Sequence, residues 1–258
     1  MTRVRSDWWK DYFNSVYLLS DSRSVLDAEV TRRETDWLKD VVRPRKSDSI
    51  LDLCGGQGRH AFEMSRRGFK DLTVLDYSSY LIRLGRKLSR KNGRGVRFVV
   101  GDARKTPLPG DAFDVVLLMT NSFGYFSDDR DNVRILKEAR RLLKRGGKLF
   151  LDLTDRERFI RSFKPLSWHE AEGDVVVCRK REMGRRVVTV RELVVSSKRG
   201  LLRDGRYKMR VFAKGEILRM LREARLRPMS VSHPGVLHER RGDYGLMNNR
   251  LSVLALRA

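Results

Sequence analysis

Residues 50–60 read Ile-Leu-Asp-Leu-Cys-Gly-Gly-Gln-Gly-Arg-His and decide the fold of the chain. An apolar run ending in an acid is followed by a glycine-rich turn, and then by a helix that we expect over 60–67, ended by Gly68. A strand that leads through such a turn into a helix N-terminus is how an α/β sheet receives a nucleotide-like ligand. Glycines allow the tight turn, and the missing Cβ lets a ligand come close. The stretch therefore predicts an α/β sheet with a ligand at the end of its first strand.

The spacing of small residues in this turn identifies the type of ligand site. Cys54, Gly56 and Gly58 recur at every second residue, unlike the dinucleotide pattern G-x-G-x-x-G. Counted from Asp52, the pattern resembles motif I of the class I S-adenosylmethionine-dependent methyltransferases. Cys54 stands where that family usually has glycine, and we interpret it as a packing residue because no neighbour would lower its pKa.

Three further landmarks follow in the order that this family has. Asp76 closes a strand expected over 72–76, where a carboxylate can accept both hydroxyls of a ribose. Asp102 follows a strand over 96–100 and resembles the family residue that accepts the adenine amino group. After a strand over 113–119, a helix over 129–144 leads through Leu-Leu-Lys-Arg-Gly-Gly into a strand over 148–153, and we expect the glycines to cap the helix.

This resemblance covers residues 48–153 and implies the fold class. We expect a Rossmann-like seven-stranded methyltransferase sheet with helices on both faces. Residues 174–212 contain strand-like runs joined by short turns, which predict an antiparallel β lid inserted after strand five. The expected organisation is 1–153 for the N-terminal helices and the S-adenosylmethionine-binding α/β core, 154–212 for the lid, and 213–258 for the completion of the core.

The elements at the two ends of the chain follow from periodicity. An aromatic amphipathic helix is expected over 6–19 and a second helix over 24–42, ending before Pro44. Aromatic residues at helical spacing usually pack on a core, so we assign no ligand contact to them. A helix over 214–225 and strands over 229–232 and 251–257 complete the predicted sheet.

The resemblance also names the residues expected to bind S-adenosylmethionine. They are Asp52, Cys54, Gly55, Gly56, Gly58, Asp76, Tyr77, Asp102, Ala103 and Met119. No metal site is expected, because two cysteines, Cys54 and Cys178, make neither a metal cluster nor a disulfide framework.

The acceptor end is expected in the loop over 120–126, after strand four. This loop lacks the two prolines of the base-amino methylases, which counts against a nucleobase amine. Its Asn-Ser-Phe-Gly-Tyr run is similar to the Asn-Ser-Phe-Ala-His segment of glycine N-methyltransferases and their small-molecule relatives. We therefore predict acceptor contacts from Asn121 and Tyr125.

Methyl transfer from a sulfonium is an in-line displacement, so positioning matters most and a general base is needed only for a protonated acceptor. His169 opens the lid region and is the histidine that we expect opposite Tyr125 across one cavity, as that base. Inward-facing arginines of the lid would suit a carboxylate or phosphate on the acceptor; the candidates are Arg179, Arg181, Arg191, Arg203 and Arg210. The segment 240–244 is expected to close the same cleft.

The charge of the chain leaves a second interpretation open. Lys and Arg number 56 against 33 Asp and Glu, a net charge of +23, and such a protein attracts nucleic acid or anionic substrates. The basic residues are spread along the chain, so we expect weak, non-specific RNA binding at most. No signal-peptide core or membrane-length apolar run is found, which predicts a cytoplasmic protein with no membrane contact. The oligomeric state is not predicted.

These observations favour one function over two others. We expect an S-adenosylmethionine-dependent methyltransferase that acts on a nitrogen or oxygen of a small-molecule acceptor. An RNA methyltransferase that uses the basic surface is the alternative, and a continuous basic face beside the cleft would favour it. A non-catalytic S-adenosylmethionine-binding protein is disfavoured, because the donor-site acids and glycines are all present.

Overall fold

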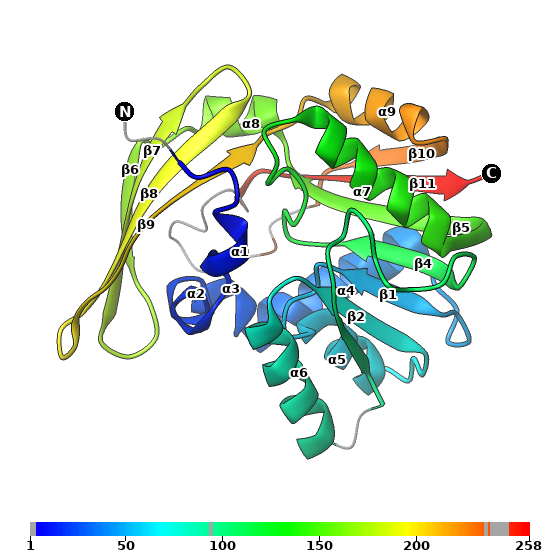
Figure 1. Ribbon diagram of the computed structural model, residues 1–258, viewed down its shortest axis with the longest axis horizontal. Helices are drawn as coiled ribbons and strands as arrows, with labels where there is room; N and C mark the ends of the chain where they lie inside the picture. The colour runs from blue at the N-terminus through cyan, green and yellow to red at the C-terminus, as the bar shows by residue number, and fades with distance from the viewer. Residues whose placement is uncertain (1–3, 93–94, 235–236, 238–247) are drawn as a thin grey trace.

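The computed structural model describes residues 4–92, 95–234, 237 and 248–258. Two β-sheets stand apart, and three short N-terminal helices lie between them (Figure 1). The larger sheet has seven strands and the smaller one has four. The predicted class, a mixed α/β fold with a separate antiparallel sheet, is therefore confirmed.

The larger sheet has the strand order β10-β11-β5-β4-β1-β2-β3. Its strands are β1 (Ile50–Leu53), β2 (Leu72–Asp76), β3 (Arg97–Val100), β4 (Phe113–Leu118), β5 (Leu143–Thr154), β10 (Leu226–Ser232) and β11 (Arg250–Arg257). The first five run parallel, whereas β11 is antiparallel to both β5 and β10. Central parallel strands are covered on both faces, which explains why β1 and β4 read as nearly continuous apolar runs.

Helices cover both faces of this sheet. They are α4 (Ala28–Val42), α5 (Arg59–Arg66), α6 (Ser79–Lys91), α7 (Asp129–Leu142) and α9 (Lys214–Glu223). Apolar residues of α7 and α9 pack on one face, and those of α4, α5 and α6 on the other. Within the described ranges, no helix is both long and apolar enough to cross a membrane.

The smaller sheet is antiparallel and follows β5 in the chain. Its strands, in order, are β6 (Leu166–Glu170), β7 (Val175–Met183), β8 (Val187–Ser196) and β9 (Gly200–Arg210), and α8 (Arg156–Arg161) precedes them. Alternate residues of β8 are buried, as expected for a sheet with one solvated face.

The N-terminal segment differs from the single helix expected over 6–19. It breaks into α1 (Trp9–Tyr12), α2 (Ser15–Ser20) and α3 (Ser22–Val25). The break has a local cause, because the Asn14 side chain accepts a hydrogen bond from the backbone nitrogen of Val16 and starts a new helix there. The next helix, α4, begins at Ala28 and not at residue 24, since Asp27 caps it.

The glycine cap expected at the end of α7 is also wrong. The helix ends at Leu142, and Leu143 already has extended backbone angles and pairs with Phe113 of β4. The register shifts after this pair, because the next pair joins Val115 of β4 to Lys148 of β5. The extra residues of β5 lie between Leu143 and Lys148, and Gly146 among them has a φ of +74°. The glycines therefore serve an irregularity at the start of β5 and do not end the helix.

Candidate active site at the carboxyl ends of the strands

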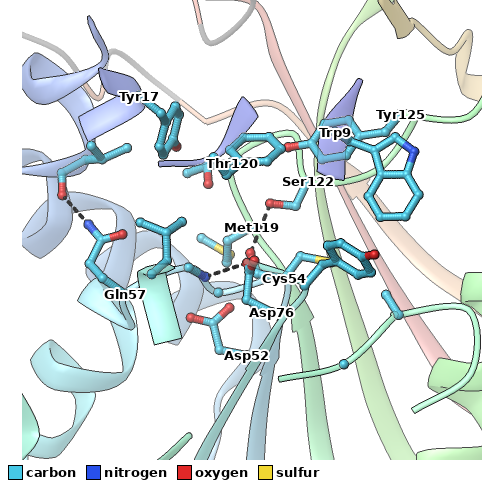
Figure 2. Close-up of a pocket in the computed structure, with 18 of the residues that line it drawn as sticks. Trp9, Tyr17, Asp52, Cys54, Gln57, Asp76, Met119, Thr120, Ser122 and Tyr125 are labelled. Atoms are coloured by element: carbon cyan, nitrogen blue, oxygen red, sulfur yellow. Dashed lines mark hydrogen bonds between the residues drawn. The ribbon is translucent and has the colours of Figure 1, made fainter. Parts of the chain in front are cut away.

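A cavity lies at the carboxyl edge of the parallel strands, as expected for an open α/β sheet (Figure 2). Nine of the ten residues predicted to bind S-adenosylmethionine line it: Asp52, Cys54, Gly55, Gly56, Asp76, Tyr77, Asp102, Ala103 and Met119. The tenth, Gly58, is not among its lining residues. The half of the cavity that is expected to hold the donor thus combines the ends of β1, β2, β3 and β4.

The glycines of the turn after β1 each meet a different steric demand. A Cβ on Gly55 would come within 2.5 Å of the Asp52 carboxyl carbon, and Gly56 has a φ of +59°. Gly58 has a φ of +83°, and a Cβ there would lie 2.8 Å from the Phe98 ring. Gly58 therefore shapes the turn from behind the cavity, which explains why the motif needs it although it does not line the site.

Asp76 connects the end of β2 to this turn. One of its carboxylate oxygens accepts a hydrogen bond from the backbone nitrogen of Gly56 at 2.8 Å, and the other accepts one from that of Ser78 at 2.8 Å. Burial raises the pKa of Asp76 above its ordinary value. The two backbone contacts hold the carboxylate at the cavity wall and leave further lone pairs for a ligand.

Asp52 is a buried acid whose hydrogen-bonding capacity is not used within the described structure. It is 2% exposed, and neither carboxylate oxygen has a hydrogen-bond partner among the described residues. Burial raises the pKa of Asp52 to about 7, although the nearby Arg59 charge opposes the shift. His60 Nδ1 lies 4.0 Å from one Asp52 oxygen. Burial lowers the pKa of His60 to about 4, so the imidazole is neutral at pH 7 and does not offset the Asp52 charge. A buried carboxylate without partners is costly, so this one indicates that a cationic or hydrogen-bond-donating ligand binds beside it.

Asp102, the acid expected at the adenine end, already has an ion-pair partner. Arg104 donates hydrogen bonds to both of its oxygens, from Nε to Oδ1 at 3.1 Å and from Nη2 to Oδ2 at 2.7 Å. Burial would raise the pKa of Asp102, but the hydrogen bonds and charge of Arg104 lower it overall. The Arg104 guanidinium also lies over the rings of Trp9 and Phe126. The N-terminal helix thereby contributes an aromatic wall to this end of the cavity.

The other half of the cavity is lined by aromatic and hydroxyl side chains. They are Phe13, Tyr17, Thr120, Ser122 and Tyr125. The Tyr125 ring lies 5.4 Å from that of Phe13 and 5.2 Å from that of Trp8, measured between ring centres. Burial raises the pKa of Tyr125 and of Tyr17 above the ordinary phenol value. Both phenols are therefore protonated at neutral pH, so that they can donate hydrogen bonds but cannot act as bases.

Two predicted acceptor residues do not reach this cavity. The Asn121 side chain is buried beside it, where its oxygen accepts a hydrogen bond from the Thr154 backbone nitrogen at 3.1 Å. His169 lies on β6 and is 6% exposed, with Nε2 at 3.1 Å from the carbonyl oxygen of Ser20. The expectation that His169 and Tyr125 face each other across one cavity is wrong, because the histidine is used in packing β6 against the end of α2.

The five arginines of the smaller sheet that were predicted to face the acceptor are likewise occupied elsewhere. Arg179 and Arg203 pair with Glu192, and Arg210 pairs with Asp129 and Glu216. Arg191 pairs with Asp204, and Arg181 bonds Ser167. None of the five lines the cavity, so the expected anion site is not formed by them. The segment 240–244, expected to close the cleft, lies outside the described residues.

Sequence reasoning missed the contribution of the N-terminal segment. Trp9, Phe13 and Tyr17 line the cavity, whereas their helical spacing had suggested core packing alone. The sequence did carry a signal for this role, because five of the ten residues 8–17, ahead of the first strand, are aromatic. Arg59 and His60, which directly follow the glycine turn, also line the cavity and were not assigned to it.

Comparison with known families matches residues 50–147 to the model of a methyltransferase domain. A ubiquinone/menaquinone biosynthesis C-methyltransferase from Ruegeria sp. is 34% identical over 143 residues, which are 54% of this chain and 56% of that protein. A demethylmenaquinone methyltransferase from Thermotoga maritima is 36% identical over 46% of this chain and 50% of its own length. The chain thus spans about half the length of the curated relatives that it matches.

Solved structures resemble the chain over more of its length. A sugar N-methyltransferase from Streptoalloteichus sp. has a TM-score of 0.74 and 21% identity, and the match covers 100% of this chain and 98% of that one. An S-adenosylmethionine-bound amino pentose methyltransferase from Micromonospora echinaspora has a TM-score of 0.71 and 20% identity, over 95% and 97% of the two chains. At these identities the likeness shows a shared fold.

Proposed function

Residues 50–147 match a methyltransferase domain, and on that premise we propose that the protein is a class I S-adenosylmethionine-dependent methyltransferase that methylates a nitrogen or oxygen of an uncharged small molecule. One observation carries the proposal. Acids at the ends of three successive strands, Asp52, Asp76 and Asp102, line one half of a cavity whose other half holds uncharged hydroxyl and aromatic groups. The first half fits the donor and the second fits an acceptor.

The donor fits the residues that line its half. S-adenosylmethionine supplies an electrophilic methyl group on a sulfonium. Asp76, already oriented by two backbone nitrogens, would accept the ribose hydroxyls, and Asp52 would pair with the ammonium of the methionine moiety. Asp102 would accept the adenine amino group on lone pairs that Arg104 leaves free.

The acceptor half supports an acceptor without formal negative charge. Its described side chains include no cation, and the five candidate arginines of the smaller sheet are paired with acids or hydrogen-bonded elsewhere. Tyr17 and Tyr125 would donate hydrogen bonds that orient the acceptor, since burial keeps both phenols protonated. The acceptor atom must then carry a free lone pair at working pH, as an amine of low pKa does. A sugar N-methyltransferase among the fold neighbours is compatible with this chemistry.

The smaller sheet, with the N-terminal helices, forms a lid in this proposal. The Tyr12 hydroxyl donates a hydrogen bond to Glu192 of β8 at 2.8 Å, and Arg203 of β9 bonds the Tyr12 carbonyl oxygen at 2.8 Å. These contacts join the segment that bears Trp9 and Phe13 to the sheet. We accordingly assign residues 154–212 to the lid, with 1–153 and 213–258 as the core.

Labelled donor offered to cell extract tests the proposal. The extract is divided into RNA, protein and metabolite fractions, and label is expected in the metabolite fraction, on nitrogen or oxygen. Label in RNA would favour the alternative that uses the basic surface, and label on carbon would favour the chemistry named for the C-methyltransferase relatives. Donor binding with no transfer to any fraction would leave a binding protein without catalysis.

A further inference from the structure

We propose that Asp152 and Arg250 are positioning residues, and that a buried ion network through Arg250 connects the acceptor wall of the cavity to its donor half. The inference rests on the proposed function. Neither Asp152 nor Arg250 lines the cavity. Both are nearly inaccessible to solvent, with Asp152 0% exposed and Arg250 4% exposed.

The network begins at a strained turn after β4. Thr120 and Asn121 have φ values of +51° and +60°, a left-handed conformation that is unfavourable for non-glycine residues and most so for a β-branched one. Thr120 lines the cavity, and Ser122 and Tyr125 follow in the same loop. The conformation of this turn therefore sets where three acceptor-facing side chains lie.

Asp152 of β5 holds both backbone donors of that turn. Its carboxylate accepts a hydrogen bond from the Thr120 nitrogen at 2.7 Å, and its carbonyl oxygen accepts one from the Asn121 nitrogen at 3.0 Å. A charged acceptor makes the first of these a strong hydrogen bond. A neighbour that satisfies both donors is what a strained turn requires in order to persist.

Arg250 of β11 in turn fixes the Asp152 carboxylate. Its Nε lies 2.9 Å from one carboxylate oxygen, and its Nη2 bonds the other, which gives a two-point contact. Its Nη1 bonds Glu34 of α4, which is 1% exposed, and the guanidinium lies over the Trp37 ring. Arg250 is thus shared between two buried carboxylates.

Glu34 carries the network to the donor half. Its other oxygen lies 2.9 Å from His60 Nε2 and also pairs with Arg59. Arg59 and His60 line the cavity, and His60 lies next to Asp52. The acids on either side of Arg250 therefore support different walls: Asp152 supports the acceptor turn, and Glu34 supports the residues beneath the expected methionine moiety.

This arrangement predicts separate effects for the two acids. Asp152→Asn weakens the hold on Thr120, so acceptor kcat/KM should fall about tenfold or more while affinity for S-adenosylhomocysteine stays within about twofold. Glu34→Gln should weaken that affinity about tenfold, the effect of losing one strong hydrogen bond. Arg250→Lys keeps the positive charge but loses the two-point contact of the guanidinium, so it should reduce both acceptor kcat/KM and affinity for S-adenosylhomocysteine. A purely structural role would lower the melting temperature in all three without this division.

The matched control is Asp114→Asn at the opposite edge of the sheet. Asp114 also accepts a hydrogen bond from a backbone nitrogen, that of Ser49 at 2.9 Å, and pairs with a cation, Lys144, at 2.7 Å. It is remote from the carboxyl edge, so its loss should leave donor affinity and acceptor kinetics unchanged. Calorimetry, steady-state kinetics and thermal melting are measured on all four variants.

A second variant tests the turn itself. Glycine adopts positive φ freely, so the Asp152→Asn defect should be smaller in a Thr120→Gly background than in the parent. Amide hydrogen exchange over residues 119–122 should be faster in Asp152→Asn and unchanged in Asp114→Asn. Equal losses in both backgrounds, or unchanged exchange at the turn, would overturn the inference. Because exchange needs neither donor nor acceptor, a failure of the proposed methyl transfer remains distinguishable from a failure of this positioning role.

Discussion

The carboxylate of Asp76 accepts a hydrogen bond from the backbone nitrogen of Gly56 at 2.8 Å, so the acid that ends β2 is fixed to the turn that follows β1. Two motifs separated in the sequence thereby form one surface. In the proposed function this surface holds the ribose of the donor, and the oxygen that faces Gly56 keeps the acid aligned before any ligand arrives.

Replacement of this acid should weaken donor binding. We expect Asp76→Ala to reduce affinity for S-adenosylhomocysteine by about 1.5 to 3 kcal/mol, the usual loss for hydrogen bonds to a charged acceptor. Calorimetry measures the change. Asp71→Ala, next to the amino end of the same strand, is the control and should bind normally; full-strength binding by Asp76→Ala would remove Asp76 from this role.

Donor affinity should depend on pH through Asp52. The folded pKa is about 7, above the ordinary value of 3.8, so below pH 7 the carboxyl is mostly neutral and cannot pair with an ammonium group. Binding should therefore strengthen from pH 6 to pH 8 and release protons at pH 6, a release that calorimetry in buffers of different ionisation enthalpy detects. Asp52→Asn should abolish the release. The folding stability of the free protein should depend on pH in the opposite direction. The Asp52 pKa is higher in the folded than in the unfolded chain, so the free energy of unfolding falls as pH rises from about 4 to about 7.

Tyr125→Phe should affect the acceptor and not the donor. Loss of one hydrogen bond to an uncharged group costs about 0.5 to 1.5 kcal/mol, so acceptor kcat/KM should fall about two- to tenfold with unchanged affinity for S-adenosylhomocysteine. Tyr80→Phe, an exposed tyrosine on α6, is the matched control. Identical kinetics in the two variants would exclude the Tyr125 hydroxyl from acceptor binding.

His169→Ala should lower stability without slowing catalysis. The imidazole is buried and bonds the Ser20 carbonyl oxygen, so its removal should cost about 1 to 3 kcal/mol of unfolding free energy. Denaturant unfolding measures that loss, and kcat near the parent value is expected. A hundredfold fall in kcat at unchanged stability would restore the general base that the sequence suggested.

RNA binding should be weak and sensitive to salt. Many of the arginines that give the chain its positive charge are ion-paired in the fold, including Arg67, Arg141 and Arg191. We expect dissociation constants on the order of 10⁻⁴ to 10⁻⁶ M at physiological salt, as for non-specific contacts. Sequence-selective binding below micromolar at that salt, measured by fluorescence anisotropy, would favour the RNA methyltransferase alternative.

The sequence predicted the parallel core well because local pattern and tertiary role agree there. Each strand from β1 to β4 is short, apolar and ended by a polar landmark, so Asp52, Asp76 and Asp102 could be placed at one edge. Acceptor residues were harder to predict, because they depend on contacts between distant segments. His169 is held by a carbonyl from α2, and Asn121 by β5, and no local pattern indicates either partner. The aromatic residues of the N-terminal segment had two plausible destinations, and contacts between distant segments decide between them: Trp9 packs on Tyr77 of the core, and Tyr12 bonds Glu192 of the smaller sheet.

The bond between Tyr12 and Glu192 joins residues that are 180 positions apart. During synthesis the aromatic segment leaves the ribosome well before β8 and β9, whose residues bond Tyr12. Contacts between residues far apart in the sequence form slowly, because the entropy of closing a large loop is lost before the contact contributes any stabilising free energy. The bonds that tie the aromatic segment to the smaller sheet can therefore form only after β8 and β9 have been made, so this part of the cavity wall is completed late.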